Sequence, residues 1–168
     1  FDNDVPEELN RKLVDHVSSF NLPYSEHARR NLIAEGIHPL FIHKTGSPIG
    51  EIFNFYRDKI ENSRALLELN LEHKKFFVVS IHRQENVDNP DRLRKILDTL
   101  STLQNEFRLP LVVSTHPRTR QRLEELSQHN LGGLLFHQPF GYLDYNKLQL
   151  SAKCVISDSG SVSEEASI

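Results

Sequence analysis

The sequence contains no methionine and only one cysteine, Cys154, among its 168 residues. A single cysteine cannot form an internal disulfide, and its position in an apolar run predicts a small buried side chain rather than a reactive thiol. No apolar run approaches the roughly 20 residues of a membrane span, and no signal peptide is visible. We therefore expect a protein of the reducing cytoplasm that has no membrane partner.

Methionine is missing even from position 1, where the chain has Phe1. At the other end the chain stops at Ile168, shortly after an expected helix has begun. Processing would explain the first observation but not the second. Together they predict an internal segment of a longer protein.

The sequence also has no excess of positive charge. It carries 20 Lys and Arg against 23 Asp and Glu, for a net charge of −3, and the cations do not gather in one block. This balance disfavours a dedicated nucleic-acid binder, so no nucleic-acid partner is expected. A hydrophobic content of 38% with 26% charged residues is typical of a globular protein, and the length suits one core or parts of two.

Residues 1–70 have the apolar period of helices and little sign of strands. Ser25 suits the N-cap of the second helix, Gly36 suits its end, and Asn62 with Ser63 interrupts the third. The predicted helices span residues 5–20, 25–34 and 49–69.

A polar stretch over residues 68–75 marks a natural domain boundary. We interpret residues 1–70 as the closing part of a first domain plus an interdomain helix. Residues 71–168 are then the beginning of a second domain.

The pattern changes after this boundary, because short apolar runs begin to alternate with helical segments. The predicted strands cover residues 76–80, 111–114, 134–136 and 155–157. The predicted helices begin at Asn89, after Pro117 and at Tyr142, and the second of them runs through Leu126. Each connection is long enough for a crossover, so the sequence predicts an α/β fold with a doubly wound parallel, Rossmann-like sheet.

Ligands of such sheets bind at the carboxyl ends of the strands, near the point where strand order reverses. The residues that follow the first three strands include His82 with Arg83, then His116, then His137. The alternative is that these are ordinary loop residues, with Arg83 in a surface ion pair. The histidines lack the paired spacing of zinc ligands and no cysteine joins them, so no metal site is expected.

The stretch from Cys154 to Ala166 is the most informative part of the chain. An apolar strand ends there in a turn of small residues (Ser159, Gly160, Ser161), and a helix follows. Backbone N–H groups and the positive end of a helix dipole suit an anionic or hydroxyl-rich ligand. Glu165 lies where a carboxylate could hold a pair of sugar hydroxyls, although it could also do no more than favour the helix start.

An ordered set of short motifs resembles the non-hydrolysing UDP-N-acetylglucosamine 2-epimerases over essentially the whole chain. The wording around His82 and from Ser114 to Arg118 is most similar to the branch that makes UDP-N-acetyl-L-fucosamine. The motifs are Pro6-Glu7-Glu8-Leu9-Asn10-Arg11, Ser25-Glu26-His27-Ala28-Arg29, Lys44-Thr45-Gly46-Ser47, Ser80-Ile81-His82-Arg83-Gln84-Glu85-Asn86, Ser114-Thr115-His116-Pro117, and Asp158-Ser159-Gly160-Ser161 with Glu164-Glu165-Ala166.

This resemblance implies part of a two-domain glycosyltransferase-B-like fold that uses no cofactor and whose complete form is a homodimer. It implies catalytic roles for His82 and Glu7, although Glu7 could also be an ordinary acidic helix start. An aromatic side chain near Tyr145 is expected beside the uracil. The expected UDP-sugar-binding set is His82, Arg83, His116, Tyr145, Ser159, Gly160, Ser161 and Glu165.

The implied activity is interconversion of C2 epimers, UDP-GlcNAc with UDP-ManNAc or a 6-deoxy analogue, by elimination and re-addition of UDP. Such a reaction would serve the synthesis of surface polysaccharide precursors. The chain departs from the family pattern in two places: the strands of the first domain and an arginine-bearing segment after the Ser-Gly helix are absent. The alternatives are a UDP-sugar glycosyltransferase of the same fold, a hydrolysing epimerase, and an inactive remnant of a split gene.

Overall fold

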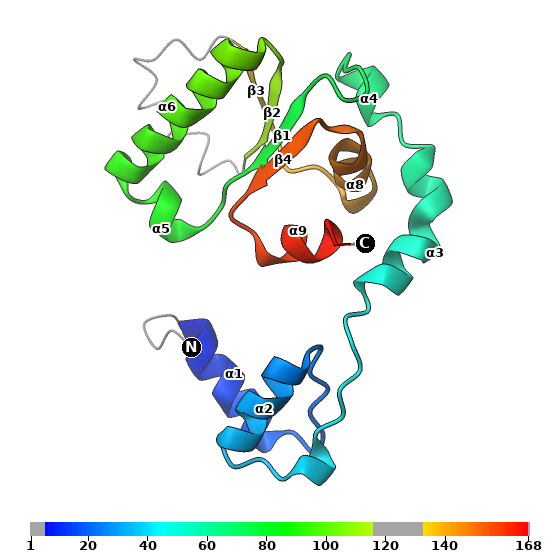
Figure 1. The fold of residues 1–168 in the computed structure, drawn as a ribbon, viewed down its shortest axis with the longest axis vertical. Helices are drawn as coiled ribbons and strands as arrows, with labels where there is room; N and C mark the ends of the chain where they lie inside the picture. The colour runs from blue at the N-terminus through cyan, green and yellow to red at the C-terminus, as the bar shows by residue number, and fades with distance from the viewer. Residues whose placement is uncertain (1–5, 116–132, 168) are drawn as a thin grey trace. The chain divides into compact units, whose positions relative to one another are not determined.

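The computed structural model describes residues 6–115 and 133–167 (Figure 1). The chain divides into two compact units, Phe1–Gly50 and Glu51–Ile168, and each is considered by itself. None of the helices in the described ranges is long and apolar enough to cross a membrane.

The first unit is a small helical assembly. Its elements are α1 (Pro6–Val17), α2 (Glu26–Ala34) and the 3₁₀ helix η1 (Pro39–Phe41). The guanidinium of Arg11 joins the two helices, because it donates to Glu8 in α1 and, at 2.6 Å, to Glu35 at the end of α2. These carboxylates raise the pKa of Arg11, first through Glu8 and then through Glu35.

The ends of α2 follow the predicted capping chemistry. The Ser25 side chain accepts a hydrogen bond from the Ala28 N–H at 3.1 Å, as an N-cap does. At the other end Gly36 has φ +95°, and its N–H and that of Ile37 donate back to Ile33 and Leu32. This is the Schellman pattern, in which a glycine in the left-handed region ends the helix. The predicted boundaries of this helix are confirmed.

A broken helix begins at the boundary and runs into the second unit, as predicted. α3 (Ile49–Glu61) and α4 (Ala65–Glu68) are separated where side chains compete for backbone hydrogen bonds. The amide of Asn62 donates to the Asp58 carbonyl at 2.8 Å. The hydroxyl of Ser63 accepts the Ala65 N–H and donates to Asp144 at 2.6 Å.

Four parallel strands form the sheet of this unit, in the order β3-β2-β1-β4. They are β1 (Phe77–Ser80), β2 (Leu111–Ser114), β3 (Leu134–His137) and β4 (Cys154–Ser157). The chain moves outward from β1 to β3 and then returns to the other side of β1. The predicted doubly wound parallel sheet is confirmed, and its order reverses between β1 and β4.

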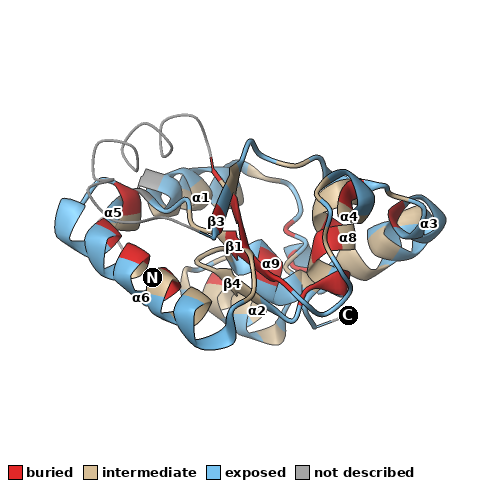
Figure 2. Cartoon of the chain, turned by 90° about the horizontal axis from the view of Figure 1, so that it is seen from above, coloured by how far each residue is buried: buried red, intermediate tan, exposed pale blue. Residues whose placement is uncertain are grey.

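Helices cover both faces of the sheet (Figure 1). The long helix α6 (Pro90–Phe107) packs on one face, and α8 (Tyr142–Ser151) with α4 packs on the other. Successive strand residues alternate between the two: Val78 faces α8, whereas Phe77 and Val79 face α6. Figure 2 shows the resulting band of buried residues along β1.

Two short helices follow β1 and β4, namely α5 (Gln84–Val87) and α9 (Gly160–Glu165). α5 was not expected from the sequence, because four residues are too few to show a helical period. The helix predicted from Pro117 to Leu126 lies outside the described residues.

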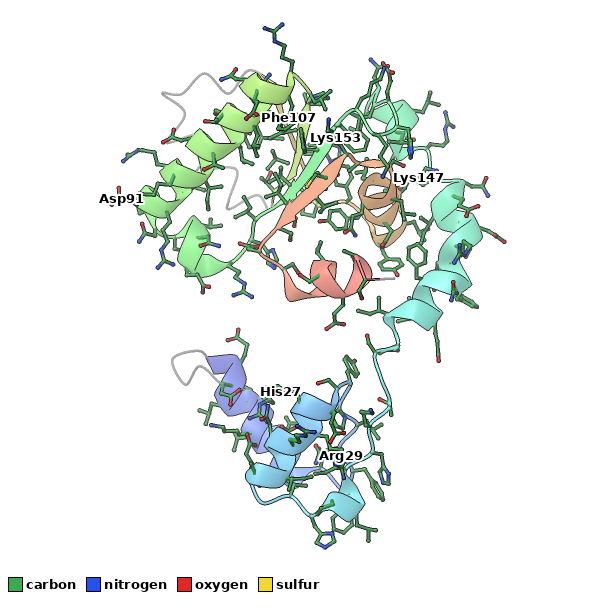
Figure 3. All side chains as sticks on the ribbon, in the orientation of Figure 1. His27, Arg29, Asp91, Phe107, Lys147 and Lys153 are labelled. Atoms are coloured by element: carbon green, nitrogen blue, oxygen red, sulfur yellow. The ribbon has the colours of Figure 1, made fainter. Side chains whose placement is uncertain are left out.

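The first part of the second unit is tied to α8. Lys147, labelled in Figure 3, donates to the Glu61 carbonyl at 2.7 Å, and Tyr56 packs edge-on against Tyr142. The predicted boundary at residues 68–75 therefore lies inside this unit, whereas the contacts divide the chain near Gly50. The division of the whole protein at residue 70 stays a prediction.

The prediction for Cys154 is wrong, because its side chain is exposed. The cysteine opens β4, and β4 is the outermost strand on its side of the sheet, so one flank of that strand has no neighbouring strand among the described residues. The preceding residue, Lys153, has its ammonium 5.0 Å from the ring centre of Phe107 at the end of α6 (Figure 3).

Packing of α8 on the sheet predicts an unequal cost for two leucines of that helix. Leu148 is fully buried and Leu150 is 49% exposed. Leu148→Ala should lower the free energy of unfolding by about 2–5 kcal/mol, because it leaves a cavity against Val78 and Phe76. Leu150→Ala is the matched control and should cost under about 1 kcal/mol. Urea unfolding followed by circular dichroism measures both, and equal losses would contradict this packing.

Candidate functional site

The candidate site lies where strand order reverses. β1 and β4 are paired in register, Ser80 beside Ser157, so the loops that leave them start side by side. The Asp158 N–H continues this pairing by donating to the Ser80 carbonyl at 3.3 Å. The loop with His82 and the serine turn therefore share one rim of the sheet, which is where doubly wound folds bind ligands.

The carboxylate of Asp158 connects the two loops. It accepts the backbone N–H of His82 at 3.1 Å, that of Arg83 at 3.1 Å and the side-chain amide of Asn86 at 3.0 Å. Burial raises the pKa of Asp158, but the hydrogen bonds from Asn86, Arg83 and His82 outweigh it, and the net pKa is lowered. The carboxylate is thus held ionised at neutral pH.

His82 and Arg83 present their polar groups at the surface of this rim. The His82 ring places Nδ1 3.1 Å from Oδ1 of Asp158, while the side chain remains 56% exposed. The Arg83 Nε donates to the Asp158 carbonyl at 2.7 Å, and its Nη1 lies 3.5 Å from the carboxylate of Glu85. Both side chains contact Asp158 and are otherwise exposed to solvent.

The serine turn leads directly into α9. The Ser157 hydroxyl accepts the Ser159 N–H at 3.0 Å, and the hydroxyls of Ser159 and Ser161 are 2.8 Å apart. The Ser159 side chain does not cap the helix. A Cβ added at Gly160 would meet no atom within 4 Å, so the backbone there is open to close approach.

Glu165 stands at the other end of α9, beside α8. One carboxylate oxygen accepts the Gln149 side-chain amide at 2.6 Å. Glu165 and Gln149 also line a cavity of about 660 Å³ together with Asn146, Cys154 and residues of α3.

Tyr145 is a partly buried residue of α8. Its ring packs against the core cluster around Leu148, and its buried hydroxyl makes no hydrogen bond of normal geometry in the described ranges. Burial raises the pKa of Tyr145, and the charge of Glu165 raises it further. The Ser80 hydroxyl lowers this pKa in part. The pKa of Tyr142 is raised as well, mostly by burial and to a smaller extent by the charge of Glu165.

The structure thus brings several of the expected residues into one region of the second unit. His82, Arg83 and the turn at 159–161 meet at the rim, with Glu165 and Tyr145 at the α8 end of α9. Glu7 belongs to the first unit, where it is exposed in the first turn of α1. His116 lies outside the described residues.

His137 shares the rim but not this site. It ends β3, which is separated from β1 by β2. Its Nδ1 lies 2.8 Å from the Gln138 carbonyl, and its ring stacks on Phe140 with 4.3 Å between centroids. This matches the ordinary loop role considered from the sequence. No group of three or more potential metal ligands is found in the parts of the chain that the structure describes.

Asp158 and Asn86 are the polar residues that sequence reasoning missed. In the sequence, Asp158 and Asn86 stand out only as members of the motifs that follow the fourth and first predicted strands. The usable signal was position, because each follows a strand that borders the reversal. That signal requires knowing that β1 and β4 are neighbours.

Known proteins match the whole chain. A family model described as UDP-N-acetylglucosamine 2-epimerase matches residues 1–168. Among curated proteins, the UDP-N-acetylglucosamine 2-epimerase of Methanocaldococcus jannaschii is 35% identical over 175 residues, which is 100% of this chain and 48% of that protein. The chain therefore spans about half the length of the curated relatives it matches.

Solved structures agree with this match. The UDP-N-acetylglucosamine 2-epimerase from Rickettsia bellii has a TM-score of 0.87 at 40% identity, covering 99% of this chain and 44% of its own. The M. jannaschii enzyme in complex with UDP-GlcNAc and UDP has a TM-score of 0.85 at 33% identity, covering 99% of this chain and 47% of its own.

The lowered pKa of Asp158 predicts a pH-dependent contribution to stability. A folded-state pKa below the ordinary value of 3.8 means that the contribution is present above that value and is lost as pH falls through the folded pKa. Asp158→Asn should therefore reduce the free energy of unfolding at pH 7 by about 1–3 kcal/mol. The substitution removes the charge that makes the hydrogen bonds to this side chain strong.

Urea titrations at pH 7 and pH 2–3 test this, since the gap between wild type and variant should narrow in acid. Asp91→Asn makes the same charge change on the exposed first turn of α6 (labelled in Figure 3) and serves as the control. A gap that stays constant with pH would contradict the assignment.

Proposed function

This chain belongs to the UDP-N-acetylglucosamine 2-epimerase family, and we therefore propose that it supplies the UDP-sugar-binding part of an isomerase that inverts C2 of a UDP-N-acetylhexosamine. The observation that carries the proposal is the shared rim of β1 and β4. There an imidazole, a guanidinium and a small-residue turn are held together by Asp158. The M. jannaschii relative has been solved with UDP-GlcNAc and UDP, which supports a ligand of this class.

The proposed nucleotide site uses both ends of α9. The diphosphate would lie over Ser159, Gly160 and Ser161, at the start of α9, where Gly160 has no Cβ to keep a ligand from the backbone. Arg83 and His82 would add positive charge or hydrogen bonds from the neighbouring loop. Glu165 would accept hydrogen bonds from the ribose hydroxyls.

Two further members of the predicted set complete this proposal. Tyr145 would border the uracil, with its packing against Leu148 keeping the ring in place. His116 remains part of the set on the resemblance alone.

The proposed chemistry follows from the weak acidity of the C2 proton. That carbon is not next to a carbonyl, so direct proton abstraction at neutral pH is unreasonable. In the elimination route the C2–H bond and the bond from C1 to the UDP oxygen break while a C1–C2 double bond forms. A proton then adds to the other face of C2 and UDP returns to C1.

Side chains of this chain suit the demands of that route. Proton transfers by carboxylate or imidazole typically contribute about 10²–10⁴-fold to the rate. We place His82 on the diphosphate side and assign Glu7 to proton transfer or its support. Donors at the start of α9 would stabilise the departing diphosphate. No step of the elimination route transfers a hydride or an electron, so we propose no cofactor.

The remaining assignments concern the whole protein. We propose a cytoplasmic homodimer in which residues 71–168 belong to the UDP-binding domain and residues 1–70 to the end of the preceding one. Its product would serve surface polysaccharide synthesis, with UDP-GlcNAc or a 6-deoxy analogue as substrate.

Solvent exchange tests the elimination route. The whole protein, incubated with UDP-GlcNAc in D₂O, should place deuterium at C2 of both epimers, because re-protonation draws on solvent. Proton NMR of the C2 signal measures this. Turnover without exchange would rule out elimination, formation of a glycoside only when an acceptor is added would indicate a glycosyltransferase, and release of free sugar would indicate hydrolysis. The 168-residue chain alone should show no turnover, because it spans about half of its relatives.

A pair of glycine substitutions tests the nucleotide site. Gly160→Ala should raise the Kd for UDP at least tenfold, about 1.4 kcal/mol, because its methyl group would occupy the space above the turn. Gly141→Ala is the matched control, since Gly141 also opens a helix and a Cβ there meets nothing within 4 Å. Isothermal titration of the chain with UDP measures both. Unchanged affinity in Gly160→Ala would place the nucleotide elsewhere.

A further inference from the structure

The contact between Asp158 and the His82 ring has a consequence for which nitrogen of that ring is free. Nδ1 of His82 lies 3.1 Å from Oδ1 of Asp158 in an ion-pair contact, whose direction is outside the range of a hydrogen bond. An ionised carboxylate has lone pairs and no proton, so it can only accept. A bare Nδ1 would place its own lone pair beside this anion, so the contact favours the hydrogen on Nδ1. In the neutral ring Nε2 is then unprotonated and acts as an acceptor.

We propose that Asp158 is a positioning residue that fixes His82 as the Nδ1–H tautomer and presents an unprotonated Nε2 at the rim. The catalytic consequence of this arrangement rests on the proposed epimerase function. The tautomer itself does not, because it follows from contacts within the second unit. In serine hydrolases a carboxylate beside Nδ1 also orients the histidine, there through a hydrogen bond.

The carboxylate is well suited to this task because it cannot easily turn away. Its oxygens also accept the backbone N–H groups of His82 and Arg83 and the amide of Asn86. The side chain of Asp158 is 14% exposed, whereas that of His82 is 56% exposed. The carboxylate is thus largely buried, whereas the imidazole ring is exposed.

Backbone pairing fixes the same geometry from both sides. Asp158 follows β4 directly, and its own N–H is bonded to the last residue of β1. The guanidinium of Arg83 holds the Asp158 carbonyl at 2.7 Å. Movement of the carboxylate relative to His82 would break several of these bonds together.

The chemical outcome is a defined role for Nε2. In the neutral ring it accepts a hydrogen bond or a proton, and it becomes a donor only after protonation. When it takes a proton the ring becomes a cation, whose charge the adjacent carboxylate balances. The protonated ring then presents an Nε2–H donor and a positive charge to the diphosphate side, where His82 is placed.

Nitrogen NMR of the 168-residue chain tests the tautomer directly. With ¹⁵N-histidine labelling and His82→Gln to assign the signal, wild-type His82 should show a protonated Nδ1 and a bare Nε2 at a pH where the ring is neutral. In Asp158→Asn the fraction of the Nδ1–H tautomer should fall. The new side chain has an NH₂ donor where the N–H groups of His82, Arg83 and Asn86 need an acceptor. Asp91→Asn should leave the His82 signals unchanged.

Two further observations keep this test decisive. Asn86→Ala removes one bond to the carboxylate but not the ring partner, so the tautomer should persist. If Asp158→Asn does not fold, the wild-type spectrum still decides. A wild-type His82 with Nε2–H and a bare Nδ1 would overturn the proposal.

Kinetics of the whole protein test the catalytic consequence. Asp158→Asn should lower kcat for UDP-GlcNAc epimerisation about 10²-fold or more, with KM changed less than about fivefold. Combining it with His82→Gln should add little. An unchanged kcat would overturn the positioning role. Absence of turnover in the wild type, together with the expected tautomer, would instead reject the proposed function and leave the histidine geometry standing.

Discussion

The parallel pairing of β1 with β4 is the constraint on which the site depends. It places two loops, far apart in the chain, at one rim with their last strand residues in register. One carboxylate then joins them, since Asp158 holds the backbone of His82 and Arg83 together with Asn86. Without that pairing, the serine turn and the histidine loop would be unrelated surface features.

The residues of this site differ in how far they are buried. Asp158 is largely buried, so its hydrogen bonds are strong, and the surrounding donors stabilise its charge. The groups that would meet a nucleotide sugar, the His82 ring, the Arg83 guanidinium and the backbone at Gly160, remain open. A rigid inner support with an accessible outer layer is the arrangement expected of a site that must bind and release a charged ligand.

Much of this fold was predictable because its signals are local. Interactions between neighbouring residues produce the cap at Ser25, the end of α2 at Gly36 and the break after α3. A continuous apolar run predicts a strand such as β1, which is buried on both faces. Cys154 and α5 were not predictable in the same way. An apolar neighbourhood does not reveal which strand lies at the edge of a sheet, and a four-residue helix has no period to read.

By itself the sequence determined the longer described helices, the strands, their parallel winding and the family to which the chain belongs, because capping, periodicity and motif wording are properties of short segments. Only the tertiary structure decided that β4 lies beside β1, that His137 is kept apart by β2, and that Asp158 meets the His82 ring. Strand order is set by how distant segments bury one another, and residues separated by 76 positions become partners only when the sheet has formed.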